Sequence, residues 1–282
     1  MKAALRKLKN PAIALAKRLI PASFRWKLRQ LQYWGSALVA IAKGAGTREC
    51  PICGYSGSFG AAGMPMRLGA VCPRCRSGER HRLLCLAIER HRLLTDVRCL
   101  LHFAPENCLA KTIAKYVDDY RTADLLPGRA QMVLNIEKLD FPDESVDAII
   151  ALHVLEHVDD RAALREIRRI LVPGGMFITA VPIVEAWATT YEDPAVVSKR
   201  DRTRHFGADD HRRWYGRDFR ERLKEAGFTV EEFVGDGSDT VKYGLVRGDT
   251  IFICRAESTT LRVVTRSRAK QHRSPRVPAS QR

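Results

Sequence analysis

Apolar runs and amphipathic segments alternate along the chain between residues 99 and 254. Runs at residues 146–152 and 176–181 flank an amphipathic helix predicted at 160–171 and a turn at 172–175. Strand, helix, glycine-containing turn and strand in this order are typical of a parallel βαβ unit. The same patterns predict further strands at residues 99–103, 120–125, 132–136, 228–234 and 250–254, and helices at residues 80–94, 107–116 and 219–226. The chain is therefore expected to fold as an α/β protein with a mostly parallel sheet.

Two cysteine pairs form a second pattern. Cys50 and Cys53 form one C-x2-C pair, Cys72 and Cys75 form the other, and 18 residues separate the pairs. Two residues between thiolates let each pair hold one ion from a tight turn, and four thiolates complete the tetrahedral shell of structural Zn²⁺. The small residues between the pairs cannot form a core, so metal binding would supply the folding energy. The alternative, two redox-active pairs, lacks the expected βαβ context.

The segment at residues 132–182 carries LDFPDESVD, HVLEHV and ILVPGG in that order. In these motifs the chain resembles class I S-adenosylmethionine-dependent methyltransferases of type 11. Residues 48–256 also resemble bacterial zinc-ribbon methyltransferases with an APE-type turn. The resemblance implies a Rossmann-like sheet, mostly parallel with an antiparallel last strand, and an enzyme that uses S-adenosyl-L-methionine. Ligands of such sheets bind at the carboxyl ends of the strands.

The resemblance also implies a set of cofactor-binding residues. Ala104, Glu106 and Cys108 stand where the family usually has the glycines of its first turn. Pro105 offers no amide to a pyrophosphate and Glu106 would repel it, which argues against NAD, whereas a carboxylate tolerates the sulfonium and ammonium of S-adenosylmethionine. The remaining positions carried over from the family are Asp124 for the ribose hydroxyls, Asn135 for the adenine amine, Ile136 for the adenine face and His153 beside the sulfonium.

Methyl transfer requires alignment of the acceptor and, for some acceptors, removal of a proton. We predict that His153, His157 or His211 is the base for methylation of an oxygen or nitrogen. His153 and His157 follow the fourth strand, and His211 lies in a polar and aromatic segment at residues 205–216 that resembles the lid of type 11 enzymes. The alternative for each is a surface position without a role, or for His157 a helix-end cap.

The net charge of +16 is concentrated at the two ends of the chain. Residues 1–49 carry +10 and residues 261–282 carry +7, so the part between them is close to neutral. Residues 1–49 predict two basic amphipathic helices that lie on an anionic membrane surface or dock on protein. Residues 259–282 are predicted to be disordered.

No signal peptide is recognised, and no run reaches the roughly 18 apolar residues of a membrane span. We therefore expect a cytoplasmic protein, with peripheral attachment to the inner membrane face as an alternative.

Four segments follow from these patterns: a basic helical extension at 1–49, a zinc-ribbon-like module at 50–79, a methyltransferase domain at 80–258 and a basic tail at 259–282.

The expected acceptor is a small molecule or a glycan intermediate. One alternative is an RNA methyltransferase whose zinc module recognises RNA through arginines such as Arg82. RNA is not favoured, because the module has few aromatic residues for base stacking. The other is a non-catalytic zinc-containing binding module on a methyltransferase scaffold.

Overall fold

The structure is a computed structural model that describes residues 46–63 and 66–257, together with residues 31, 35, 38, 39, 41 and 42. Those six residues are helical and exposed. The rest of the predicted N-terminal helices and the predicted tail at 259–282 lie outside the described residues. The described part of the chain contains no helix long and apolar enough to cross a membrane. The chain divides into two compact units, Met1–Leu86 with Gly235–Arg247 and Ala87–Val234 with Gly248–Arg282.

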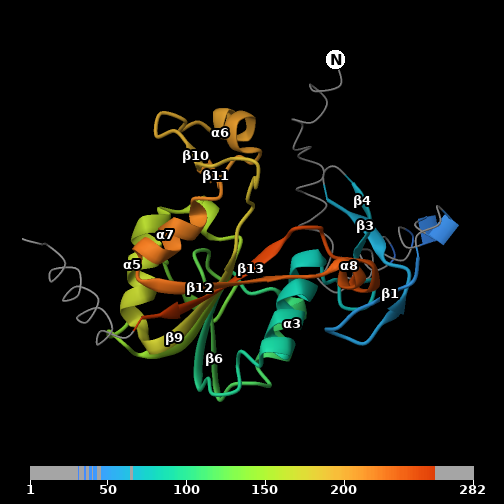
Figure 1. The fold of residues 1–282 in the computed structure, drawn as a ribbon, viewed down its shortest axis with the longest axis horizontal. Coiled ribbons are helices and arrows are strands. Elements are labelled where there is room, and N and C mark those ends of the chain that lie inside the picture. Colours follow the sequence, from blue (N-terminus) through green and yellow to red (C-terminus); the bar gives the residue numbers. More distant parts are fainter. Residues whose placement is uncertain are drawn as a thin grey trace, which may run out of the picture. The chain divides into compact units, whose positions relative to one another are not determined.

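A seven-stranded sheet forms the second unit (Figure 1). Its strands are β5 (Cys99–Phe103), β6 (Asp119–Asp124), β7 (Met132–Val133), β8 (Val146–Leu152), β9 (Leu171–Ala180), β12 (Phe228–Val234) and β13 (Thr250–Ala256). They are arranged in the order β12-β13-β9-β8-β5-β6-β7, and β13 is antiparallel to both of its neighbours while the other pairings are parallel. The prediction of a mostly parallel sheet with an antiparallel last strand is confirmed.

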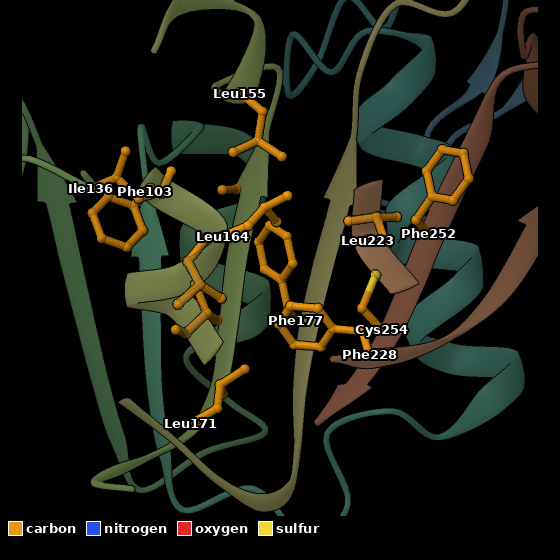
Figure 2. Close-up of a cluster of buried hydrophobic side chains, with 14 of the residues drawn as sticks. Phe103, Ile136, Leu155, Leu164, Leu171, Phe177, Leu223, Phe228, Phe252 and Cys254 are labelled. Atoms are coloured by element: carbon orange, nitrogen blue, oxygen red, sulfur yellow. The ribbon is translucent and has the colours of Figure 1, made fainter. Parts of the chain in front are cut away.

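Helices α5 (Asp160–Ile170) and α7 (Phe219–Glu225) pack against the buried side chains of this sheet. The carboxylate of Asp159 begins α5 by accepting a hydrogen bond from the Ala162 amide at 3.0 Å. Ala163, Leu164 and Ile167 recur at helical spacing and are fully buried. Figure 2 shows Leu164 together with Phe177 of β9 in this cluster. The same apolar stripe that predicts the helix therefore forms its contact with the sheet.

Several predicted boundaries differ from the structure. Residues 172–175, predicted as a turn, belong to β9, where the pairing with β8 shifts register and Gly174 has a φ of +76°. The strand predicted at 132–136 ends at Val133, because the Asn135 side chain accepts a hydrogen bond from the Glu137 amide at 3.0 Å and turns the chain. Helices α3 (Glu79–His91) and α4 (Asn107–Ile113) end three residues before their predicted ends.

Four elements lie where the patterns predicted none. They are β10 (Tyr191–Glu192), α6 (Lys199–Phe206), β11 (Arg213–Trp214) and α8 (Gly237–Tyr243). The first three lie in the segment between β9 and α7, and β10 pairs with β11 in antiparallel orientation. Helix α8 belongs to the first unit.

The first unit contains the cysteine module and is larger than the predicted segment 50–79. Two hairpins form it, one of β1 (Arg48–Glu49) and β2 (Ser56–Gly57), the other of β3 (Gly60–Ala62) and β4 (Arg67–Val71). The Arg82 side chain is fully buried and donates hydrogen bonds to the carbonyl oxygens of Ser77 and Gly244. Arg82 is therefore a structural residue of this unit and is not exposed to contact RNA.

Candidate functional site

The carboxyl ends of β5, β6 and β8 lie at one edge of the sheet. Phe103 of β5 is paired with Ala123 of β6 and with Ala151 of β8. The pairing brings together three residues predicted to bind the cofactor: Ala104, Asp124 and His153. Parallel α/β sheets bind their ligands at this edge, at the point where the strand order reverses.

The turn after β5 has a left-handed backbone although it contains no glycine. Ala104 has a φ of +48°, and its amide donates a hydrogen bond to the Ala123 carbonyl at 2.8 Å. For a residue with a Cβ atom this conformation costs about 1–2 kcal/mol. The turn therefore has the backbone shape for which the family usually uses glycine.

Glu106 follows this turn at the N-terminal end of α4. Its Oε2 atom lies 3.3 Å from Nε2 of His102, whose side chain is fully buried in β5. The His102 Nδ1 atom lies 2.8 Å from the Tyr120 hydroxyl, and burial raises the pKa of Tyr120 so that it remains a neutral phenol. The carboxylate of Glu106 is thus fixed under the turn, where a ligand's positive charge would be favoured.

The other predicted cofactor residues differ in their surroundings. The Asp124 Oδ1 atom accepts a hydrogen bond from the Leu126 amide at 2.8 Å, which leaves the second oxygen for a ribose hydroxyl. Asn135 is exposed, and its side-chain oxygen accepts the Glu137 amide. Ile136 is buried in the hydrophobic cluster that includes Phe103 (Figure 2). Their roles toward a cofactor remain predictions.

A cluster of histidines and one glutamate follows β8, at the short helix η2 (Leu155–His157). His153 has a φ of +53°, and its Nδ1 atom lies 3.2 Å from Oε1 of Glu156. The rings of His157 and His211 meet edge to face with their centroids 4.8 Å apart. One ligand atom each of Glu156, His157 and His211 lies within 4.8 Å of the others. The structure therefore brings together the three histidines predicted as candidate bases.

Glu156, which the sequence places with His153 and His157 among the candidate residues after the fourth strand, is the most buried member of this cluster. Its side chain is 1% exposed, and among the described residues neither its Oε2 atom nor Nδ1 of His211 has a hydrogen-bond partner. Burial lowers the pKa of His211 below its ordinary value, although the Glu156 carboxylate acts in the opposite direction. The sequence signal for Glu156 is its place in the H-x2-E-H motif.

A buried ionic network joins the segments that carry this cluster. The Asp160 carboxylate, 2% exposed, accepts hydrogen bonds from the Tyr215 hydroxyl at 3.0 Å and from Arg222 at 2.9 Å. Arg213 donates to the Leu155 carbonyl at 2.9 Å and to Glu192 at 2.8 Å. These bonds tie β10 and β11 to η2. The network therefore fixes the backbone on which His157 and His211 are carried.

The four cysteines of the first unit have the arrangement of a metal-binding site. The Sγ atoms of Cys50 and Cys75 are 3.5 Å apart, those of Cys53 and Cys72 are 3.6 Å apart, and all four lie within 4.8 Å of one another. Four thiolates at the zinc–sulfur distance of about 2.3 Å lie about 3.8 Å apart in a tetrahedron. Gly54 has a φ of +68°, as required for the chain to turn over the first pair. The four residues fit a tetrahedral Zn²⁺ ion.

Part of the sheet unit is similar to known methyltransferases. Residues 108–179 match the family model described as "Methyltransferase domain". A "Probable S-adenosylmethionine-dependent methyltransferase" of Mycolicibacterium smegmatis is 31% identical over 125 residues, which are 44% of this chain and 42% of that protein. The chain thus matches about two fifths of the length of this relative. Over the matched residues, the chain is therefore similar to methyltransferases.

Solved structures with similar folds include two described as methyltransferases. One is an S-adenosylmethionine-dependent methyltransferase of Mesorhizobium loti, with 14% identity, a TM-score of 0.45 and coverage of 62% of this chain and 98% of that chain. The other is a SAM-dependent methyltransferase of Archaeoglobus fulgidus, with 11% identity, a TM-score of 0.43 and coverage of 64% and 96%.

Proposed function

We propose that the protein is an S-adenosylmethionine-dependent methyltransferase that methylates an oxygen or nitrogen of an acceptor. The observation that carries this proposal is the match of residues 108–179 to a methyltransferase domain, since this segment runs from α4 to β9 and spans the ends of β6 and β8. Those ends carry Asp124 and His153 beside the left-handed turn at Ala104. The segment that matches a methyltransferase domain therefore includes the edge of the sheet at which we place the ligand.

The residues at this edge have chemically distinct tasks. S-adenosylmethionine supplies a methyl group that its sulfonium already activates. The free oxygen of Asp124 binds a ribose hydroxyl, and the carboxylate of Glu106 faces positive charge on the cofactor. His153 borders the sulfonium and is placed to take the acceptor's proton, with its own Nδ1 held near Glu156.

For the acceptor we place a small molecule or glycan intermediate ahead of RNA. The part of the chain between the basic ends is close to neutral, and this net charge favours a small acceptor over RNA. In the first unit, Arg82 is buried and Arg67 is paired with Glu79 at 2.8 Å, so both of these arginines are already engaged within the protein. A zinc ion held by the four cysteines acts structurally in this proposal. Contact of residues 1–49 with an anionic membrane remains a prediction, which liposome co-sedimentation tests.

Calorimetry with S-adenosylmethionine tests the proposal. Asp124→Asn keeps an oxygen for the Leu126 amide but loses the charged acceptor, so we expect about 10- to 100-fold weaker binding, as for loss of a charge-assisted hydrogen bond. Asp118→Asn, at an exposed position just before β6, is the matched control and should bind like the native chain. Absence of binding at millimolar cofactor would refute the enzyme and favour the non-catalytic scaffold. Transfer of radioactive methyl to glycan or RNA fractions then distinguishes the acceptors.

A further inference from the structure

We propose that Glu156, His157 and His211 bind a divalent transition-metal ion at the carboxyl edge of the sheet, as a second metal site besides the four cysteines. Glu156 and His157 lie on η2, and His211 lies in the segment before β11. One ligand atom of each residue lies within 4.8 Å of the others. Two ligands of one ion with bonds of about 2.1 Å are about 3–3.5 Å apart, so rotations of these side chains suffice to close the site.

The backbone around these residues is fixed from both sides. The Arg212 amide donates a hydrogen bond to the Glu156 carbonyl at 2.8 Å, which joins the segment carrying His211 to η2. Arg213 adds bonds to the Leu155 and Val158 carbonyls at 2.9 and 2.8 Å. Such support favours metal binding, because ligands on a fixed backbone lose less freedom when the ion binds.

Two buried atoms point to a cation at this position. Glu156 is 1% exposed at its side chain, yet its Oε2 atom has no hydrogen-bond partner among the described residues, and the same is true of Nδ1 of His211. A buried carboxylate oxygen and a buried imidazole nitrogen without partners are both costly, and both are metal ligands when deprotonated. One ion bound between them satisfies both atoms at once.

The neighbours orient these ligands in the way metal sites require. The Nδ1 atom of His153 lies 3.2 Å from Oε1 of Glu156, which leaves Oε2 for the ion. Oδ1 of Asp210 lies 3.5 Å from Nδ1 of His157, which leaves Nε2 of that ring as the ligand. A carboxylate behind a metal-binding histidine fixes its ring and raises its basicity.

The donor set selects the class of metal. Two imidazoles and one carboxylate bind Zn²⁺ and related divalent transition metals with positions left open for other ligands. Mg²⁺ and Ca²⁺ prefer oxygen ligands and fit this set poorly. The site is therefore expected to accept Zn²⁺, Mn²⁺, Fe²⁺ or Co²⁺ and to keep room for an oxygen of a substrate.

This position gives the metal a role in choosing the acceptor, a role that rests on the methyl transfer proposed above. A bound divalent ion lowers the pKa of a hydroxyl group that coordinates it. The acceptor would accordingly be an alcohol or phenol. Its oxygen forms a bond to the methyl carbon as the carbon–sulfur bond breaks, S-adenosylhomocysteine leaves, and the hydroxyl proton passes to His153 or to water.

Cobalt titration of the full chain, loaded with one equivalent of Zn²⁺, tests the site. We expect a further equivalent of Co²⁺ to bind with weak d–d absorption bands and without the intense thiolate charge-transfer bands of a cysteine site. Glu156→Gln and His211→Ala should each weaken this binding at least 100-fold. His91→Ala is the matched control, since His91 pairs with Glu231 on the same unit and should leave the affinity unchanged.

The outcomes separate this inference from the proposed function. Failure of the native chain to bind the further Co²⁺, or binding by Glu156→Gln as tight as by the native chain, overturns the metal site. Circular dichroism checks that the variants are folded. If His211→Ala is not folded, Glu156→Gln, whose glutamine is nearly isosteric with glutamate, decides whether the metal site exists. Calorimetry with S-adenosylmethionine is measured separately, so cobalt binding without cofactor binding refutes the methyltransferase and retains the metal site.

Discussion

Replacing Arg82 with methionine tests whether one buried guanidinium holds the first unit together. The Arg82 side chain is fully buried and donates four hydrogen bonds of 2.6–3.0 Å to carbonyl oxygens. The acceptors lie on β4, on the loop after the second cysteine pair and at the end of α8: Ala70, Ser77, Tyr243 and Gly244. Residues distant in sequence thus share one donor group.

The expected loss of stability follows from those bonds. Methionine at position 82 keeps much of the volume but donates nothing, and the Ser77 carbonyl still accepts the Cys72 amide at 3.0 Å. Three carbonyls therefore lose their donor, at about 1–3 kcal/mol for each group left buried without a partner. Since some of them can reach water after relaxation, we expect a loss of about 3–5 kcal/mol. The rate of zinc release should also rise about 10- to 100-fold, because the charge of Arg82 interacts with the thiolates of Cys50 and Cys72.

Two measurements check this expectation. Amide hydrogen exchange of residues 46–86 reports the opening free energy of the unit, and a chromogenic chelator reports zinc release. Arg74→Met is the matched control, because Arg74 lies at the exposed rim and donates one bond of 3.1 Å to the Cys53 carbonyl. Its replacement should cost less than about 1 kcal/mol. If Arg82→Met is no more destabilising than Arg74→Met, the reasoning from buried carbonyls is wrong.

Three further predictions concern other parts of the chain. Asp160→Ala removes the buried carboxylate shared by Arg213 and Arg222, leaves them only the more exposed Glu192, and should lower the free energy of unfolding by about 3–5 kcal/mol, whereas Arg161→Ala, which removes an exposed ion pair, should cost less than about 1 kcal/mol in urea unfolding. Cys72→Ser should lower bound zinc by about one equivalent relative to the native chain by atomic absorption, with Cys99→Ser retaining the native amount; unchanged zinc in Cys72→Ser contradicts the four-cysteine site. Ala104→Gly should raise the melting temperature, because glycine relieves a left-handed backbone that costs about 1 kcal/mol; a lower melting temperature contradicts the strain.

Much of the sheet could be predicted because strands such as β8 are mainly apolar and β12 alternates apolar and polar residues. The strands β8 and β12 have the predicted bounds, since both of their ends coincide with polar or turn-forming residues. Helix α8 has no apolar stripe, and its start depends on a capping box in which Asp236 and Asp239 bond to each other's backbone amides. That signal is local and short, so hydrophobic periodicity could not reveal it.

The parts of the site that escaped prediction depend on long-range pairing. Strands β10 and β11 have two residues each, and the ion pair of Arg213 with Glu192 joins positions 21 residues apart. No local pattern shows that these side chains are buried against Asp160. The histidines, in contrast, were found because their residue type alone suggests proton transfer or metal binding. Residue chemistry identified the candidates, and only the fold shows that they share Glu156.

The lack of glycine in the turn after β5 does not by itself argue for an inactive scaffold. Ala104 and His153 both have left-handed backbones, and both stand directly after parallel strands at the edge where ligands bind. Such conformations cost free energy for residues other than glycine and persist where the surrounding structure determines them, commonly at ligand sites. Alanine and histidine here reproduce the chain path that glycine would allow at lower cost. The chain therefore adopts these two left-handed turns without glycine at the predicted cofactor edge, where Glu106 contributes a carboxylate and His153 an imidazole.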